Sequence, residues 1–380
     1  MNYNIEALKM HEKNKGKIAI KSKIELNTKD DLSTAYTPGV AEPCRKIYEN
    51  PDDVYKYTSK GNLVAVISDG SAVLGLGNIG PKAAIPVMEG KCILFKEFGD
   101  VDAFPICLDT QDTEEIIKAV KQLAPVFGGI NLEDISAPRC FEIEKRLVEE
   151  LDIPVFHDDQ HGTAVVVLAA LINSLKLRNS KIEDIECVIN GAGAAGIAIC
   201  KLLQSAGIKN VILCDTKGAI NKNRTDLNSA KAAMAQITNI NDESGTLADV
   251  LKGKDLFIGV SAADMLSKEM VKSMNNPIIF AMANPAPEIL PQDALDAGAF
   301  IVGTGRSDFD NQINNVLVFP GLFRAVLDLR LKEFTEEIKL AAAKAIASVV
   351  KDEELSKTYI LPSSLNRSVV PAIAEAIKSL

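Results

Sequence analysis

Two pairs of acidic residues directly follow apolar stretches of the sequence: Glu133-Asp134 comes after GGINL, and Asp158-Asp159 comes after IPVFH. Carboxylate oxygens are the ligands that hard divalent cations such as Mg²⁺ and Mn²⁺ prefer. A single acidic pair is more often a solvated turn. Two pairs that share one edge of a sheet instead favour an oxygen-lined cation site.

The second pair lies in VFHDDQHGTAVVV, which we expect to join a buried strand to a helix. Gly162 and Thr163 would supply the turn and the helix N-cap before the apolar helix TAVVVLAALINSL. No cysteine or third histidine stands near enough to complete a zinc site with His157 and His161. We interpret the two histidines as groups that support the acidic pair or cap the helix.

A glycine-rich turn follows the apolar run IECVIN and precedes the alanine-rich helix of AAGIAICKLLQSAG. Its pattern G-x-G-x-x-G, set between a strand and a helix, is the fingerprint of a dinucleotide-binding loop. Gly191 would permit the turn, Gly193 the approach of pyrophosphate, and Gly196 the packing of helix on strand. The predicted cofactor loop is Gly191, Ala192, Gly193, Ala194, Ala195 and Gly196.

The next apolar run, NVILCD, ends in Asp215, which is 19 residues beyond Gly196. A carboxylate at this spacing contacts the ribose hydroxyls of NAD. Lys217 and Lys222 follow closely and could tolerate a 2′-phosphate, so NADP stays open as the cofactor. A second glycine pattern, GLGNIG at residues 75–80, is followed by too short a segment for a second dinucleotide site and is interpreted as a substrate loop.

The elements that must position these residues alternate between apolar, β-rich runs and helical segments. This alternation predicts an α/β fold with parallel sheets covered by helices. The runs expected as strands are NLVAVISD, KCILFKE, AFPICLD, GGINLED, IPVFHDD, IECVING, NVILCD, LFIGVSA, IIFAMANP and AFIVGTG. Because polar residues end many of these runs, they should gather at one sheet edge, which is the predicted cleft.

The length of 380 residues favours two domains or slightly more. We expect an N-terminal substrate and metal domain at residues 1–160 and a doubly wound, Rossmann-type dinucleotide-binding domain at residues 161–330. A C-terminal helical segment would occupy residues 331–380.

Composition excludes several classes of protein. A net charge of −9 disfavours nucleic acid and anionic membranes as partners. The longest apolar runs fall short of a membrane span, and the N-terminus has no apolar signal core. Seven cysteines, an odd number without a C-x-x-C motif, indicate reduced core residues. We therefore expect a soluble, cytoplasmic protein without a membrane partner.

Taken together, several motifs resemble those of the malic enzyme family, in particular its compact bacterial type. The matching segments are AYTPGVAEPC, SDGSAVLGLGNIGPKAAIPVMEGKCILFK, VDAFPICLDT, INLEDISAP, PVFHDDQHGTA, GAGAAG, MANPAPEI and NNVLVFPG. They run in the family's order from about Tyr36 to Gly321. The resemblance implies oxidation and decarboxylation of (S)-malate to pyruvate and CO₂ with reduction of NAD(P)⁺, by a homodimer that needs Mg²⁺ or Mn²⁺.

The resemblance also assigns roles to single residues. Tyr36 matches the family's general acid and Lys91 its general base. Asn284 matches a residue that touches substrate and nicotinamide, and Asn315 one that touches substrate. The residues that match the metal ligands are Glu133, Asp134 and Asp159. A lysine can act as a base near neutrality if burial or nearby positive charge lowers its pKa.

One departure from the family's pattern concerns the substrate's distal carboxylate. Larger relatives carry an arginine just before LGLG, where this chain has Ala72-Val73. The replacement candidates are Ser71, Lys82, Arg45 and Arg306, and Lys82 is also a rival for the base. Two alternative functions stay open: a 2-hydroxy-acid dehydrogenase that does not decarboxylate, and a catalytically silent nucleotide-sensing protein.

Overall fold

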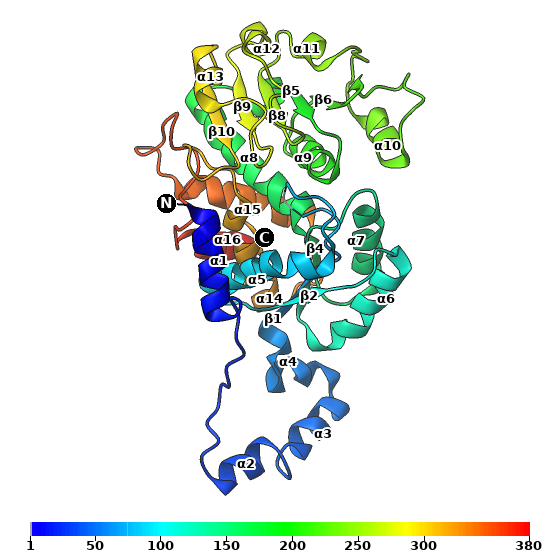
Figure 1. Ribbon diagram of the computed structural model, residues 1–380, viewed down its shortest axis with the longest axis vertical. Helices are drawn as coiled ribbons and strands as arrows, with labels where there is room; N and C mark the ends of the chain where they lie inside the picture. The colour runs from blue at the N-terminus through cyan, green and yellow to red at the C-terminus, as the bar shows by residue number, and fades with distance from the viewer. Residues whose placement is uncertain (1, 74) are drawn as a thin grey trace.

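The computed structural model describes residues 2–73 and 75–380. Its first sheet has four parallel strands in the order β2-β1-β3-β4 (Figure 1). They are β1 (Leu63–Ser68), β2 (Asp102–Cys107), β3 (Gly129–Leu132) and β4 (Val155–His157). Glu133-Asp134 and Asp158-Asp159 follow β3 and β4, which are neighbours, so the two acidic pairs lie at the same sheet edge.

The second sheet has six strands in the order β10-β9-β8-β5-β6-β7, and only β7 is antiparallel to its neighbour. The strands are β5 (Glu186–Asn190), β6 (Asn210–Asp215), β7 (Gly218–Ala219), β8 (Leu256–Gly259), β9 (Ile278–Ala281) and β10 (Ile301–Thr304). The chain proceeds from β5 to β6 on one side and later to β8 on the other. Ligands of doubly wound sheets bind at such a reversal of strand order.

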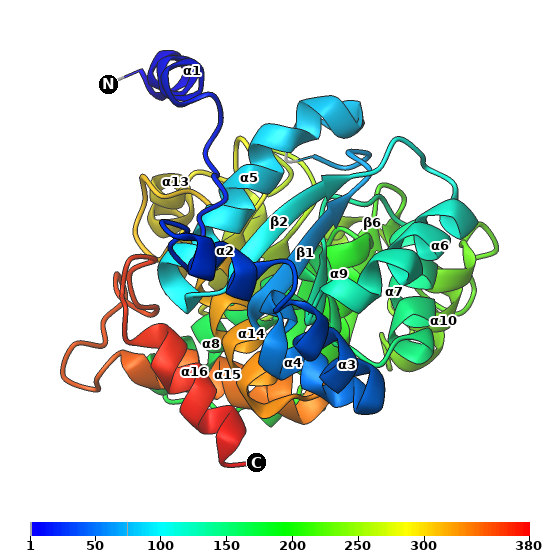
Figure 2. The same cartoon turned by 90° about the horizontal axis from the view of Figure 1, so that it is seen from below.

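Helices cover both faces of the first sheet (Figure 2). Val64 and Val66 of β1 belong to the same apolar cluster as Phe95 of α5 (Gly80–Gly99). Ala65 and Ile67 point to the opposite face, in a cluster with the helices α6 (Thr113–Leu123) and α7 (Arg139–Glu150). This alternation is what a strand buried on both faces requires.

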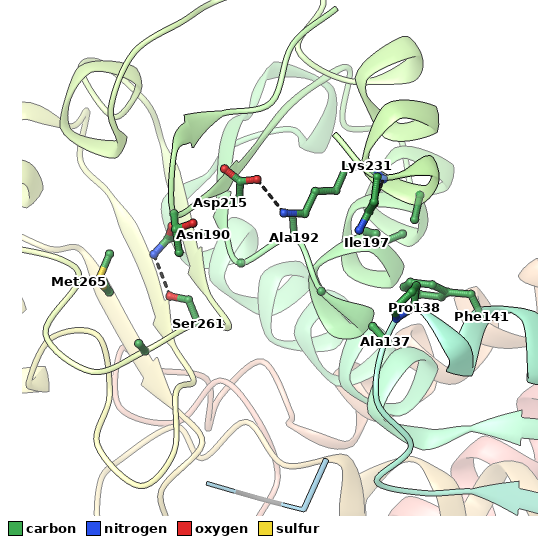
Figure 3. A pocket seen from close by; sticks show the side chains of 16 residues that line it. Ala137, Pro138, Phe141, Asn190, Ala192, Ile197, Asp215, Lys231, Ser261 and Met265 are labelled. Atoms are coloured by element: carbon green, nitrogen blue, oxygen red, sulfur yellow. Dashed lines mark hydrogen bonds and ion pairs between the residues drawn. The ribbon is translucent and has the colours of Figure 1, made fainter. Parts of the chain in front are cut away.

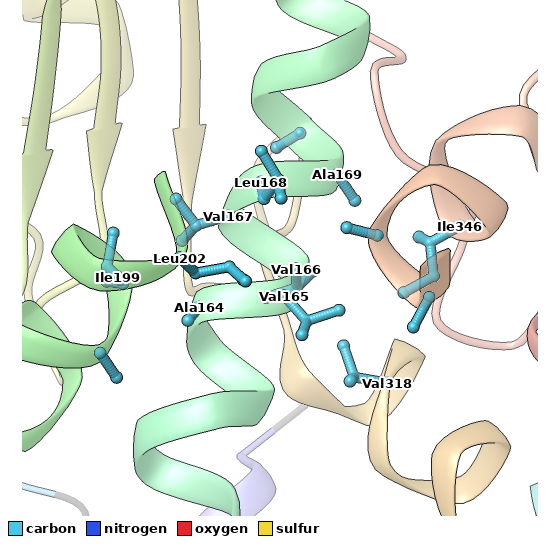
Figure 4. Close-up of a cluster of buried hydrophobic side chains, with 14 of the residues drawn as sticks. Ala164, Val165, Val166, Val167, Leu168, Ala169, Ile199, Leu202, Val318 and Ile346 are labelled. Atoms are coloured by element: carbon cyan, nitrogen blue, oxygen red, sulfur yellow. The ribbon is translucent and has the colours of Figure 1, made fainter. Parts of the chain in front are cut away.

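The centre of the molecule is α8 (Asp158–Arg178), which packs against α9 (Ala194–Ser205) and α15 (Glu336–Val349) (Figure 4). The helix is apolar on all sides, as expected of a helix surrounded by protein. It is the one helix, within the described part of the chain, that is long and apolar enough to cross a membrane. Because 72% of its apolar window is buried in the fold, it is the core helix of a soluble protein.

The remaining helices complete the layers. α14 (Phe319–Leu329) and α16 (Val369–Lys378) pack on each other, and α14 also packs on α5. The C-terminal helices therefore contact the first sheet's helix layer as well as α8. Further helices along the second sheet's part of the chain are α10 (Ser229–Ile237), α11 (Leu247–Val250), α12 (Lys268–Ser273) and α13 (Pro291–Asp296). Short 3-10 turns lie at Pro51–Asp53, Ser59–Asn62, Ala124–Val126, Ile182–Asp184 and Asn315–Leu317.

The chain before β1 lies largely outside this body. α1 (Tyr3–Asn14), α2 (Lys29–Ala35), α3 (Ala41–Glu49) and α4 (Val54–Tyr57) contain no buried residue. Residues 18–58, which we call the N-terminal arm, extend away from the sheets (Figure 1). Large apolar side chains stand in solvent along the arm, among them Ile20 at 90% and Tyr48 at 91% exposure.

Two expectations from the sequence differ from the structure. The run KCILFKE is not a strand but part of α5, because Pro86 lies inside a continuous helix instead of ending it. α8 begins at Asp158, one turn before the predicted Gly162-Thr163 start, with His157 as its N-cap. The domain boundary placed at residues 160 and 161 stays a prediction, and in the fold it falls within α8.

Candidate active site

A cleft of about 930 Å³ lies where the carboxyl ends of both sheets meet. Several predicted site residues line it, namely Lys91, Glu133, Asp159, Ala194, Ala195, Asn284 and Asn315. They come from α5, the loop after β3, α8, α9, the loop after β9 and the 3-10 turn before α14. Residues spread over more than 220 positions of sequence thus share one cavity.

Lys91 is the buried cation of this cleft, with only 7% of its side chain exposed. Its Nζ lies 2.6 Å from Asp158 Oδ2 and 3.0 Å from Glu133 Oε1. The same ammonium lies 4.0 Å from the centre of the Phe319 ring. Burial alone would lower the pKa of Lys91, but the two carboxylates outweigh it and raise this pKa above its usual value. The contacts of Lys91 with these carboxylates therefore do not by themselves produce the lowered pKa that a lysine base near neutrality requires.

The carboxylates of Glu133, Asp134 and Asp159 form the cluster that a cation could occupy. One ligand oxygen from each lies within 4.8 Å of the others. Asp134 Oδ2 is buried and has no hydrogen-bond partner among the described residues. Burial, followed by repulsion from Asp159 and Glu133, raises the pKa of Asp134 to about 9. This unbalanced negative charge, presented by oxygen ligands only, fits Mg²⁺ or Mn²⁺.

Asp158 does not belong to this cluster and binds other groups of the cleft. It accepts hydrogen bonds from Lys91 and from the Asn315 amide. A side chain at Gly162 would collide with its carboxyl group, which explains why a glycine stands inside an otherwise well-formed helix. Burial raises the pKa of Asp158 to about 6, although Lys91 opposes the shift.

Glu144 is a buried residue of α7 that sequence reasoning missed. Its carboxylate accepts the backbone N–H of His157 at 2.8 Å and Gln160 Nε2 at 3.0 Å. It also lies 3.0 Å from His161 Nε2. Glu144 thus fixes the turn that carries Asp158 and Asp159. Its place on the apolar face of α7, one position after Ile143 and three before Leu147, was the available signal.

The two histidines differ in what they contact. His161 serves the supporting role expected of it, through Glu144. His157 is fully buried, its ring nitrogens have no partner among residues 2–73 and 75–380, and its Nε2 lies 3.9 Å from Asp159. Neither belongs to the carboxylate cluster.

The predicted dinucleotide loop lines a smaller cavity of about 390 Å³ that adjoins the cleft at Ala137 and Ser261 (Figure 3). Gly191 has a φ of +121° and packs on Val260. A side chain there is therefore excluded both by the backbone conformation and by collision with Val260. A Cβ at Gly193 would meet open space, which leaves room for a ligand. Gly196 packs on the carbonyl of Gly191, as close contact between helix and strand requires.

Asp215 lies at the far end of this cavity, and Lys231 lines it beside Asp215. On the opposite side, a hydrogen bond of 2.8 Å joins Asn190 to Ser261 Oγ. Buried Glu288 accepts the backbone N–H groups of Ser261 and Ala283 and so holds the loop that presents Asn284. Gly75 of the second glycine pattern packs on Asn284 and Pro285, which agrees with its interpretation as a loop at the substrate cleft.

The candidates for the distal carboxylate do not line the cleft. Ser71 is buried, and its hydroxyl oxygen already accepts hydrogen bonds from Ser136 N–H and from Arg139. Arg306 forms an ion pair with Asp308. Lys82 and Arg45 are exposed elsewhere. The cations that line the cleft are Lys91 and Lys17, the latter from the segment after α1. Its role could not be read from the sequence, because no motif surrounds it.

Tyr36 is not brought together with Lys91 in a single chain. It ends α2 on the N-terminal arm, is 68% exposed and does not line the cleft. The arm's extension away from the body separates it from the remaining site residues (Figure 1).

A carboxylate cluster that could hold a cation, beside a buried lysine and a dinucleotide loop at a strand-order reversal, is the arrangement expected of an oxidoreductase that uses a nicotinamide cofactor. Comparison with known families makes this assignment specific. Residues 13–148 match the profile of the malic enzyme N-terminal domain, and residues 160–379 match that of the malic enzyme NAD-binding domain. The chain belongs to the malic enzyme family.

Individual relatives agree over nearly the whole chain. It is 57% identical to a bifunctional malic/malolactic enzyme of Bacillus subtilis, covering 99% of this chain and 92% of that protein. It is 61% identical to an NAD-dependent malic enzyme of Geobacillus stearothermophilus, covering 95% and 76%. The crystal structure of an NAD-dependent malic enzyme from Thermotoga maritima superposes with a TM-score of 0.94 at 51% identity, covering 98% of each chain.

These findings confirm the family, the fold class and the activity predicted from the sequence. The protein is an NAD(P)-dependent oxidoreductase that oxidises and decarboxylates malate. The non-decarboxylating dehydrogenase and the silent sensor are no longer needed as alternatives.

Proposed function

We propose that this chain converts (S)-malate to pyruvate and CO₂ in the cleft between its two sheets, with Lys91 as the base. The observation that carries the proposal is the buried contact of Lys91 with Asp158 and with Glu133, which itself belongs to the carboxylate cluster. We propose NAD as the simplest cofactor, with NADP also accepted, and Mg²⁺ or Mn²⁺ as the cation. Localisation in the cytoplasm stays a prediction.

Each side chain has a defined task in this proposal. Lys91 takes the proton from the C2 hydroxyl, and Asp158 and Asn315 hold it in place through their shared hydrogen bonds. Asn284 orients substrate and nicotinamide, and Lys17 faces the second carboxylate. A divalent cation held by Glu133, Asp134 and Asp159 would neutralise the negative charge that surrounds Lys91 and would so lower the pKa of Lys91. The same cation would polarise the oxygen at C2 of the substrate.

Tyr36 has to come from a second copy of the chain. Because the arm has no buried residue, its contacts within one chain cannot offset the conformational entropy that is lost when the arm becomes ordered. The many exposed apolar side chains along the arm are typical of a protein interface. In a two-fold homodimer, each arm would lie on the partner and place Tyr36 in the partner's cleft, where it protonates C3 after CO₂ leaves.

The reaction is tested by following reduced cofactor at 340 nm from (S)-malate, with NAD⁺ or NADP⁺, in Mn²⁺ or in EDTA. Equimolar reduced cofactor, pyruvate and CO₂ are expected, in Mn²⁺ only. Reduction without release of CO₂ would contradict decarboxylation, and undiminished rates in EDTA would contradict the metal requirement.

Binding of Mn²⁺ is expected to stabilise the fold by about 2.7 kcal/mol at a hundredfold excess over its dissociation constant. Because the pKa of Asp134 is raised to about 9, the metal-free folded protein binds more protons than the unfolded chain between about pH 4 and pH 9. Its stability therefore falls as pH rises through this range. Thermal unfolding should show a larger Mn²⁺ effect at pH 8 than at pH 6.

The variant Asp159→Asn removes one of the repelling carboxylates. It should stabilise the metal-free protein, abolish the Mn²⁺ effect and stop turnover, while NADH still binds. Asp109→Asn is the matched control, because Asp109 follows β2 at the same sheet edge but lies outside the carboxylate cluster. An unchanged Mn²⁺ effect in Asp159→Asn would remove Asp159 from the metal ligands.

A further inference from the structure

Glu288 is a fully buried carboxylate that lines neither cavity of the site but contacts a loop of each. Its Oε1 accepts the backbone N–H of Ser261, in the loop after β8, at 3.1 Å. Its Oε2 accepts the backbone N–H of Ala283, in the loop after β9, at 3.0 Å. A single carboxylate therefore joins two loops that belong to different strands.

The two loops serve different parts of the site. The loop after β8 lines the dinucleotide cavity through Ser261 and Met265, and Ser261 also reaches the cleft (Figure 3). The loop after β9 lines the cleft and carries Asn284. Glu288 thus lies behind the boundary between the dinucleotide side and the substrate side.

The end of β8 leaves room for this carboxylate. A side chain at Gly259, the last residue of β8, would collide with the carboxyl group of Glu288, so a glycine is required there. The backbone carbonyl of Glu288 also accepts the N–H of Leu266 at 3.0 Å. Residue 288 therefore holds the loop after β8 at both of its ends, as well as the loop after β9.

This shared acceptor makes the positions of the two loops depend on each other. Burial raises the pKa of Glu288, and the N–H groups of Ala283 and Ser261 oppose the shift because they stabilise the ionised form. Movement of either loop alone would leave one oxygen of a buried carboxylate without its donor, which costs more free energy than the loss of an exposed hydrogen bond. We therefore expect the two loops to become ordered together.

We infer that Glu288 is a positioning residue that couples the binding of the dinucleotide to the binding of malate. A ligand that contacts Ser261 orders the loop after β8, and Glu288 transmits this order to the loop that presents Asn284. The second ligand then loses less conformational free energy and binds more tightly. The inference rests on the proposed function in that malate contacts Asn284, and it adds a link between the cavities that requires no contact between the two ligands.

The test uses ADP-ribose, which is the cofactor without its nicotinamide, so that malate and the nicotinamide ring cannot contribute a direct contact. Calorimetry measures the affinity of the full-length protein for (S)-malate in Mn²⁺, with and without ADP-ribose, and no turnover occurs under these conditions. The unaltered protein should bind malate about fivefold more tightly when ADP-ribose is present, the lower end of typical couplings between sites. Malate should strengthen the binding of ADP-ribose by the same factor, because such coupling is reciprocal.

Glu288→Gln keeps the size of the side chain but replaces one acceptor oxygen with an amide group that cannot accept an N–H. The coupling factor should fall below about twofold, while the affinity for ADP-ribose alone should stay within about threefold of normal. Gly259→Ala displaces the same carboxyl group from the side of β8 and should reduce the coupling as well.

Asp255→Asn is the matched control, because Asp255 is a buried carboxylate directly before β8 that accepts the backbone N–H of Glu186. It lies at the opposite end of the strand, so its loss should lower the melting temperature without changing the coupling factor. An unchanged coupling factor in Glu288→Gln or in Gly259→Ala, or an equal loss in Asp255→Asn, would overturn the inference.

The unaltered protein separates this inference from the proposed function. If it binds both ligands but shows no coupling between them, the inference is wrong and the proposed function is unaffected. If it binds neither malate nor ADP-ribose, the proposed function itself is wrong.

Discussion

Replacing Lys91 with alanine is expected to lower kcat by about two to four orders of magnitude, the usual contribution of a positioned general base. Lys91 is the buried group between Asp158 and Glu133, whereas the other lysine of the cleft, Lys17, donates to the carbonyl of Pro86. NADH binding should be unaffected, because the dinucleotide loop lies in the adjoining cavity. Steady-state kinetics with saturating malate and Mn²⁺ would measure the effect.

Two controls separate chemistry from stability in this experiment. Removing Lys91 leaves buried carboxylates without their cation, which costs about 3–5 kcal/mol in comparable sites. Lys91→Arg keeps the charge but cannot act as a base near neutral pH, so it should fold and still be inactive. Lys82→Ala changes an exposed lysine of the same helix and should be active. Near-normal turnover by Lys91→Arg would assign the base to another residue.

Exchange of subunits between two inactive variants is expected to restore activity. Tyr36→Phe and Lys91→Ala should each be inactive as homodimers. If Tyr36 acts in the partner's cleft, a mixed dimer has one site that contains both an intact Lys91 and an intact Tyr36. Co-expressed variants that pair at random should therefore regain about a quarter of normal activity, because half of the dimers are mixed and one of their two sites works.

The outcome distinguishes the two arrangements of the arm. If Tyr36 served its own chain, each site of the mixed dimer would lack one of the two groups, and no activity would return. The matched control is Tyr48→Phe combined with Lys91→Ala, because Tyr48 is another exposed tyrosine of the N-terminal arm. The hydroxyl of Tyr48 has no proposed role, so Tyr48→Phe should be active alone. Sedimentation would verify that all variants are dimers.

Much of the site could be predicted because it depends on local sequence. Each acidic pair stands at the end of a short apolar run, and a parallel sheet brings neighbouring strand ends together whatever their distance in sequence. The glycine loop was equally clear, since Gly191 and Gly196 meet backbone constraints and Gly193 leaves open space, as the sequence pattern expresses. The acidic pair was thus correctly predicted at the end of β4, and Gly196 at the start of α9, although α8 already begins at Asp158.

The remainder depended on contacts that no local pattern records. Glu144 stood on the apolar face of α7, but no pattern showed which turn it would hold, and Lys231 lies on a helix where a polar residue on a solvated face would look the same. Lys91–Glu97 was predicted as a strand because its apolar run is short. The helix α5 instead continues through Pro86, and the apolar periodicity around Pro86 did not indicate a helix. The position of Tyr36 could not be predicted from a single chain, because in the proposed dimer the surface that binds it belongs to the partner subunit.

The course of α8 has a consequence for how this protein can be divided. Its first turn carries Asp158 and Asp159, and its apolar sides share one cluster with Val64 of β1 and Ile189 of β5. The two malic enzyme domain profiles match residues 13–148 and 160–379, so the division between them falls between α7 and α8. Both sheets nevertheless pack against the same apolar cluster. The halves should therefore melt in one cooperative transition, and neither should survive as an exchangeable module once cut at residue 160.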